Sequence, residues 1–151
     1  MLDSVGIEYL LIEADSICRG VTANTTAKIT SQHGLIYSRL LREFGPDTAR
    51  MYWAANEYAL TRYRRLCRNI SCDFELKDAY LYSTGRPDQL EREMKALETL
   101  HIPAEYTNTL SLPFPTTGAI RFKQQAQFHP LKFAAAIAKS LNIREHTEAV
   151  A

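Results

Sequence analysis

What the sequence lacks excludes several classes of protein. No apolar run is long enough to span a bilayer, and the first residues lack the basic flank and long apolar centre of a secretion signal. The formal net charge is only +1, which gives no general attraction to nucleic acid or to anionic lipid. The three cysteines, Cys18, Cys67 and Cys72, have no metal-ligand spacing, so we expect reduced thiols, no metal centre and a cytoplasmic location.

Glycine is also scarce, and none of the six glycines belongs to a Gly-x-Gly-x-x-Gly turn. A dinucleotide-binding βαβ unit normally carries that turn between its first strand and its first helix. Leu2, Val5 and Gly6 have the pattern of a last helical turn ended by a left-handed glycine. We therefore expect the chain to begin about one strand and most of one helix into such a unit.

The composition that remains is typical of a folded domain, because 46% of the 151 residues are hydrophobic. The clearest local element is the apolar run Tyr9–Ile12, which Glu13 closes. A short run of this kind predicts a strand buried on both faces of a parallel sheet. An acid at the carboxyl end of the second strand of a dinucleotide-binding unit accepts hydrogen bonds from both ribose hydroxyls. Glu13 is therefore a candidate ribose ligand; the alternative is an acid that simply ends a strand at the surface.

The segment 14–34 is polar and rich in small residues, which predicts a loop at the carboxyl edge of the sheet. Small residues let backbone N–H groups approach a phosphate, and hydroxyl groups add donors without bulk. The alternative is a solvated connection capped by Thr25 or Thr30. Lys28 and His33 are the titratable groups of this loop, and the pattern assigns neither of them a role.

Periodicity predicts the other elements of the chain. Proline at a first helical position marks the start of three of them. We expect four helices: a short one ending at Phe44-Gly45, one from Pro46 to Cys67, one from Pro87 through Leu100, and one from Pro130 with Phe133, Ile137 and Leu141 facing inward. We expect four strands, over Asp73–Tyr82, Ala104–Thr107 (an edge strand), Gly118–Lys123 and Ile143–Val150.

Two stretches carry a resemblance to a known family. They are IEYLLIEADSICRGVTANTTAKITSQHG at 7–34 and GAIRFKQQAQFHPLKFAAAIA at 118–138. Both resemble the FAD-dependent oxidoreductases of the D-amino acid oxidase, glycine oxidase and sarcosine oxidase type. The similarity runs from Gly6 to about Val150 and covers only the early-middle part of such an enzyme. An NAD-binding protein would also use an acid at Glu13, but these two stretches match the flavin family.

The resemblance implies an α/β fold, namely an incomplete Rossmann-like FAD-binding domain with an inserted α+β substrate-domain segment. In those terms, residues 1–70 and 129–151 belong to the FAD-binding domain and residues 71–128 to the substrate-domain segment.

The resemblance also implies the residues that hold the cofactor. Glu13 corresponds to the ribose ligand, and the segment that wraps the pyrophosphate and the flavin edge corresponds to Gly20, Thr22, Asn24, Thr25 and Thr26. The usual second glycine of that segment is replaced by Thr26 or Ala27.

The function implied is that of a fragment of an FAD-dependent oxidoreductase that oxidises a C–N bond in a small amine or amino acid. FAD is expected in the complete protein, and absent or weakly held in this chain because the phosphate turn is lacking. No catalytic residue is assigned, and the roles of Lys28, His33 and His129 stay open. The alternative is a truncated, non-catalytic fragment that folds or self-associates through exposed sheet edges.

Overall fold

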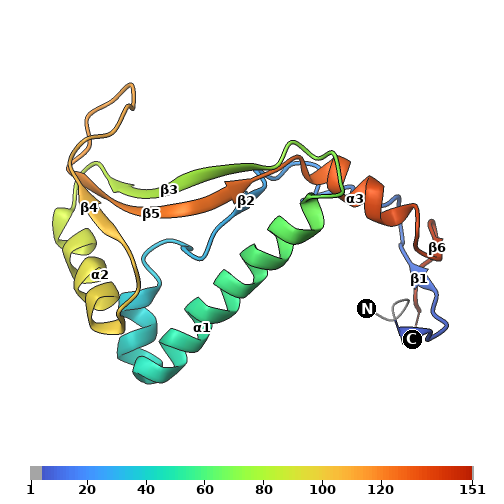
Figure 1. Cartoon of the computed structure of the whole chain (residues 1–151), viewed down its shortest axis with the longest axis horizontal. Coiled ribbons are helices and arrows are strands. Elements are labelled where there is room, and N and C mark those ends of the chain that lie inside the picture. Colours follow the sequence, from blue (N-terminus) through green and yellow to red (C-terminus); the bar gives the residue numbers. More distant parts are fainter. Residues whose placement is uncertain (1–4, 151) are drawn as a thin grey trace.

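The computed structural model describes residues 5–150 and places most of them around one antiparallel sheet (Figure 1). Helices α1 and α2 cover one face of that sheet, while α3 leads away to a separate pair of strands, β1 and β6. In chain order the elements are β1 (Leu11–Ile12), β2 (Lys28–Ile29), α1 (Tyr37–Cys67), β3 (Glu75–Ser83), α2 (Pro87–Leu100), β4 (Glu105–Thr107), β5 (Gly118–Gln127), α3 (Pro130–Ala138) and β6 (Ile143–Arg144).

Strand β5 is the centre of the antiparallel sheet. On one edge it pairs with β3 along the whole length of that strand, from Gln127 opposite Glu75 to Gly118 opposite Ser83. On the other edge β2 pairs with the last residues of β5, and β4 pairs with residues 119–121. Among residues 5–150, residues 122–125 of β5 therefore have no strand neighbour on that second edge.

The main hydrophobic core lies between this sheet and the two helices, and it follows the predicted periodicity. Leu90, Leu97 and Leu100 of α2 are all buried, as the apolar stripe predicts. They belong to one cluster with side chains from α1, β3 and β5. Since α1 and α2 also contact each other, the sheet and its helices pack as one unit.

Helix α1 is two helices joined at a kink. Gly45 has φ +79° and ψ 173°, which is not a helical conformation, and Pro46 follows it directly. Proline lacks the N–H that the second helix would leave unpaired at its start, so the chain changes direction here at little cost. The predicted break at Phe44-Gly45 is thus confirmed.

The expectation of a strand buried on both faces at Tyr9–Ile12 is wrong. The strand β1 has only two residues, and Leu10, Leu11 and Ile12 are 51%, 42% and 41% exposed. The physical reason is that β6 is the one strand that pairs with β1 among the described residues, and it pairs in parallel register. The apolar pattern indicates that the strand is suited to burial, but within residues 5–150 only β6 lies beside it.

One further expectation needs correction, one strand was not predicted, and one expectation lies outside the described residues. The strand predicted over Ile143–Val150 is limited to β6. The predicted inward-facing residues Phe133 and Ile137 of α3 are half-buried, and Phe133 packs against Tyr63 and Phe128. The two-residue strand β2 was not predicted, because it lies in the segment expected to be a loop. The helical turn proposed at Leu2 lies outside the described residues, although Gly6 does take a left-handed φ of +69°.

A buried carboxylate joins the two main helices. Glu93 of α2 is 1% exposed, and its two oxygens accept hydrogen bonds from the backbone N–H groups of Tyr37 (2.8 Å) and Ser38 (2.9 Å). The first N–H groups of a helix have no partner within the helix and carry partial positive charge. The N-cap residue Ile36 offers no side-chain acceptor, so Glu93 supplies the missing cap from another helix.

We predict that Glu93→Gln lowers the free energy of unfolding by about 1–3 kcal/mol, because the amide removes the charge and turns one acceptor into a donor. Urea denaturation followed by circular dichroism measures this change. The matched control is Glu91→Gln, an exposed acid on the same helix, which should change stability by less than about 0.5 kcal/mol. Equal stability of the two variants would contradict the capping role.

Candidate functional site

Glu13 lies immediately after β1, at the carboxyl end of a parallel strand, as the sequence predicts. Its backbone is fixed by the segment around β6: its N–H donates to the carbonyl of Arg144 (3.0 Å), and its carbonyl accepts from the N–H of Thr147 (2.9 Å). The side chain is half-buried, and Oε1 accepts from the N–H of Asp15 at 3.0 Å. The carboxylate is therefore oriented by the chain and retains acceptor capacity for hydroxyl groups.

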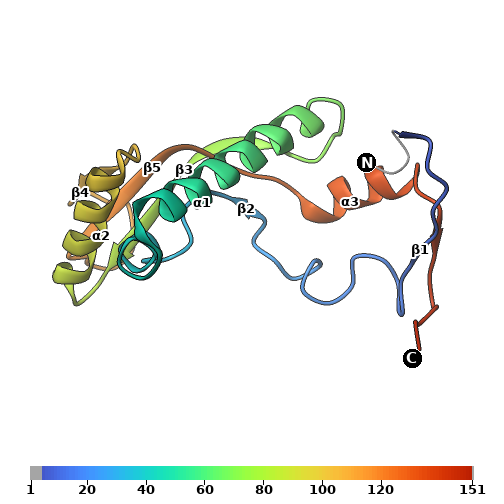
Figure 2. The same ribbon diagram turned by 90° about the horizontal axis from the view of Figure 1, so that it is seen from below.

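The segment 14–34, which the sequence predicts as one loop, follows strand β1. Its first part runs from β1 to β2 across the open side of the molecule (Figure 2), and its end, residues 30–34, lies between β2 and α1. Gly20 takes a left-handed φ of +71°, and its carbonyl accepts from Asn24 Nδ2 at 2.7 Å. Asn24 therefore shapes the loop through its amide group. Thr22, Thr25 and Thr26 are exposed, so their hydroxyl groups and nearby backbone face solvent.

Ala27 occupies a conformation that glycine normally supplies. Its φ is +50°, and the residue is 6% exposed. Its N–H donates to Thr25 Oγ1 at 3.2 Å, which stabilises the turn locally. Thr26 or Ala27 is expected from the sequence to replace one glycine, and of these two Ala27 is the residue with the positive φ that glycine adopts most easily.

Two of the predicted ligands line a cavity of about 480 Å³ between this loop and the start of α3. Thr25 and Thr26 lie on one side of it, and His129 lies on the other. The His129 ring accepts from the N–H of Lys132 (3.4 Å) and so caps α3, while its own backbone N–H donates to the carbonyl of Cys72 (2.6 Å). The other predicted ligands, Glu13, Gly20, Thr22 and Asn24, do not line this cavity.

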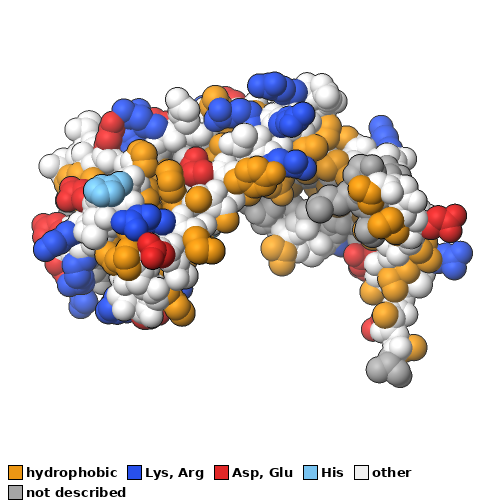
Figure 3. Space-filling model, turned by 60° about the horizontal axis from the view of Figure 1, so that its bottom comes forward, with side chains coloured by type: hydrophobic (Ala, Val, Ile, Leu, Met, Phe, Trp, Pro, Cys, Tyr) orange, Lys and Arg blue, Asp and Glu red, His pale blue; other side chains and the backbone are white. Residues whose placement is uncertain are grey.

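The space-filling view shows why these groups remain apart. The molecule is arched, with a hollow between the sheet with its helices and the β1–β6 end (Figure 3). Glu13 lies at the β1–β6 end, whereas Thr25 and Thr26 lie next to the sheet. The predicted cofactor residues are therefore arranged along the loop that joins these two parts.

The end of this loop is held by a residue that the sequence reading did not single out. Ser31 is fully buried although it belongs to no helix or strand. Its N–H donates to Gln125 Oε1 at 2.7 Å, and its carbonyl accepts from the hydroxyl of Tyr37, whose pKa burial raises. Gln125 in turn donates to the carbonyl of Lys123 at 3.1 Å. Both backbone groups of Ser31 are thus fixed by side chains from β5 and α1.

A bulge in the sheet places Gln125. The register between β3 and β5 shifts between Lys77 and Ala79, and Gln124 takes a φ of +56°. Asp78 stabilises this irregular backbone, because its carboxylate accepts from Arg121 Nε (2.8 Å) and from the N–H of Gln124 (3.1 Å). The hydrogen bond from Arg121 holds the pKa of Asp78 below its usual range.

We predict that Asp78→Asn destabilises the protein at neutral pH and that this difference disappears in acid. The pKa of Asp78 is lower in the folded state than in the unfolded state. Its contribution to the free energy of unfolding is therefore fully present above the unfolded-state pKa of about 3.9, and it is lost as the pH falls through the folded-state pKa. Urea denaturation of both proteins between neutral pH and pH of about 3 tests this. A difference that stays constant over that range would contradict it, and Asp47→Asn, an exposed acid on α1, serves as the control.

The comparisons with known proteins establish the class of this chain. The family described as FAD dependent oxidoreductase matches residues 2–151, so the chain belongs to that family. Its fold is accordingly α/β and related to Rossmann-like FAD-binding domains, as expected.

Two individual proteins that the chain resembles are longer than it. It is 35% identical over 140 residues to the putative Rieske 2Fe-2S iron-sulfur protein YhfW of Bacillus subtilis (strain 168), and this match covers 90% of the chain but 28% of that protein. The crystal structure of glycine oxidase from Geobacillus kaustophilus is similar with a TM-score of 0.54 and 15% identity, over 90% of this chain and 39% of that one. The chain thus spans less than half the length of either protein.

Residues 5–150 contain neither a membrane-spanning helix nor a metal-binding cluster. No helix in this range is long and apolar enough to cross a bilayer. The same residues contain no group of three or more His, Cys, Asp or Glu side chains arranged to hold a metal ion. The roles of the six predicted cofactor ligands stay predictions.

Proposed function

We propose that the chain is part of an FAD-dependent enzyme that oxidises a C–N bond in a small amine or amino acid. The observation that carries this proposal is the family match along nearly the whole chain, together with Glu13 at the carboxyl end of a parallel strand. We also propose the division into FAD-binding residues 1–70 and 129–151 and substrate-segment residues 71–128. The pairing of β2 with β5 then joins the two parts.

The residues present fit the cofactor chemically. The oriented carboxylate of Glu13 suits the two ribose hydroxyls, and the exposed threonines and backbone N–H groups around Gly20 and Thr25 suit a pyrophosphate. When bound, FAD supplies the capacity to accept a hydride equivalent from the carbon that bears the amine. The chain itself would hold the dinucleotide. The hydrogen bonds between Ser31 and the side chains of Gln125 and Tyr37 would fix the end of the 14–34 loop.

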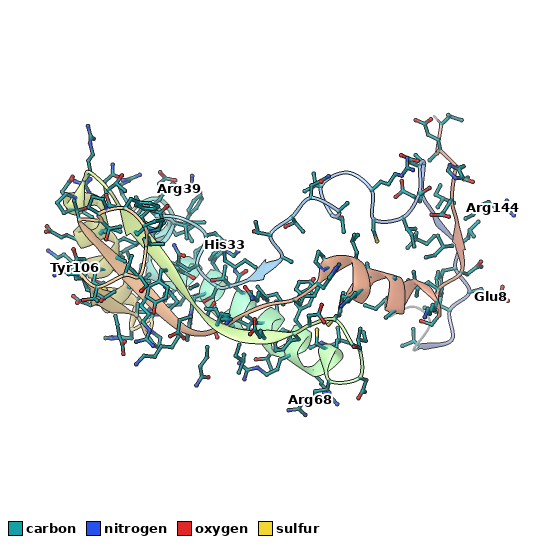
Figure 4. The ribbon with its side chains drawn as sticks, turned by 90° about the horizontal axis from the view of Figure 1, so that it is seen from above. Glu8, His33, Arg39, Arg68, Tyr106 and Arg144 are labelled. Atoms are coloured by element: carbon teal, nitrogen blue, oxygen red, sulfur yellow. The ribbon has the colours of Figure 1, made fainter. Side chains whose placement is uncertain are left out.

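We predict that Glu13→Gln in the full-length protein weakens FAD binding by about 1.5–3 kcal/mol, because a charge-assisted hydrogen bond is lost. Flavin retention is measured from the absorbance near 450 nm and from titration of the apoprotein with FAD. The matched control is Glu8→Gln, since Glu8 is exposed and projects at the same end of the molecule as Arg144 of β6 (Figure 4). Unchanged FAD affinity in Glu13→Gln would remove this residue from the site.

A second proposal concerns the electron acceptor. The curated relative is named as a Rieske 2Fe-2S iron-sulfur protein, and we propose that a cluster of this kind would serve as a one-electron acceptor for the reduced cofactor, passing each electron on to an external one-electron oxidant. Substrate turnover with a one-electron dye but without hydrogen peroxide would support this acceptor, and one peroxide formed per substrate would contradict it.

We also propose a cytoplasmic location, which the three free thiols of this chain support.

We predict that the 151-residue chain self-associates when it is isolated. Strand β1 exposes apolar side chains, and the outer edge of β3 has no strand partner among residues 5–150, so a second copy can cover both. Size-exclusion chromatography with light scattering at concentrations of tens of micromolar measures the mass. A single species of 17.2 kDa would contradict this prediction.

A further inference from the structure

A cavity of about 490 Å³ lies between α1 and the central strand β5, beside the part of β5 that neither β2 nor β4 covers. Its walls come from α1, from the segment at the start of β4 and from residues 121–125 of β5. No residue between Glu13 and Thr26 lines it, so it is separate from the proposed cofactor loop. Its volume is within the range of about 300–1,000 Å³ that is usual for small-molecule sites.

One part of the cavity wall is apolar. Trp53 and Leu60 of α1 face it together with Phe122 of β5. Leu60 and Phe122 are almost fully buried, and Trp53 is half-buried at the opening. This combination offers flat apolar surface to an aromatic or aliphatic body.

Most charges around the cavity neutralise each other. Glu105 forms ion pairs with Arg121 (3.5 Å) and with Lys123. Glu57 is the other acid of the lining, and it accepts a hydrogen bond from Gln125 Nε2 at 3.4 Å. These groups therefore leave little net charge of their own at the cavity.

Arg64 is the cation of the lining that has no acidic partner. Among residues 5–150 it forms no ion pair, and its buried Nε has no hydrogen-bond acceptor. One Nη group donates weakly, at 3.4 Å, to the carbonyl of Gln124. The guanidinium cannot lose its proton in a protein, so this partly desolvated charge is unfavourable until an anion pairs with it. Glu57 precedes Arg64 by about two helical turns, roughly 10 Å along the axis.

We propose that this cavity binds a small monocarboxylate with an apolar body. The carboxylate accepts hydrogen bonds from the two Nη groups of Arg64, and the apolar body lies against Trp53 and Phe122. A guanidinium presents two parallel N–H groups that match the two oxygens of a carboxylate, which a single ammonium group does not. Binding is reversible, involves no covalent step and does not depend on the cofactor.

The sequence provides a direct reporter for this site, because Trp53 is the only tryptophan of the chain. We expect phenylacetate at neutral pH to change the tryptophan fluorescence of the 151-residue chain saturably. Phenylacetamide has nearly the same shape but no charge, and it should bind at least about tenfold more weakly. Equal affinity for the two compounds, or no saturable change up to about 10 mM phenylacetate, would overturn the proposal.

Variants of the arginine test the same site independently. Arg64→Gln should weaken phenylacetate binding by at least about tenfold, and Arg64→Lys, which keeps the charge but loses the fork, by less. Arg65→Gln is the matched control, because Arg65 is exposed on the same helix and does not line the cavity. An equal loss in Arg65→Gln would indicate general attraction and overturn the proposal. Circular dichroism verifies folding, and the comparison of the two compounds in the unaltered chain holds even if a variant unfolds.

Discussion

Every strand of the antiparallel sheet forms its hydrogen bonds with β5, and this constraint determines where the other parts of the molecule lie. On one edge, β3 pairs with β5 from Gly118 to Gln127. This pairing fixes the position of the hydrophobic core between the sheet and helices α1 and α2. On the other edge two short strands leave the middle of β5 uncovered. The unpaired cation and the apolar wall of the cavity face that uncovered part, so the gap in the sheet and the candidate ligand site have one origin.

The bulge in the same strand links the sheet to the loop assigned to the cofactor. If residues 122–125 alternated regularly, without the bulge at Gln124, the side chain of Gln125 would point to the face of the sheet opposite that of Phe122. Because of the bulge, Gln125 instead meets the backbone of Ser31. A local irregularity in the substrate segment thereby fixes the end of a loop whose beginning is held by β1 and β6.

The sequence predicted those elements that are marked by a local signal, such as a proline at a helix start or a repeated apolar stripe. Proline at Pro46, Pro87 and Pro130 marked helix starts that the structure contains, and the leucine stripe of α2 identified its buried face. The prediction failed where burial depends on distant neighbours. Leu11 and Ile12 have the composition of a core strand, but among residues 5–150 no element buries them.

Residues that act over long sequence distances were also missed. Glu93 interrupts an otherwise apolar stripe, and its partner is the start of another helix 55 or 56 residues away. Gln125 contacts a loop 94 residues away, so no local pattern marks it. In contrast, the position of Glu13 could be predicted, because a strand and the acid that closes it are adjacent in sequence.

The parallel pairing of β1 with β6 has a consequence for the order in which the chain folds. Hydrogen bonds around this pair join residues that lie 128 to 134 positions apart, whereas β3, α2, β4 and β5 are close in sequence. Contacts of long sequence separation require the largest loss of chain entropy before they are formed. We therefore expect β3, α2, β4 and β5 to fold first and β1 and β6 to pair afterwards.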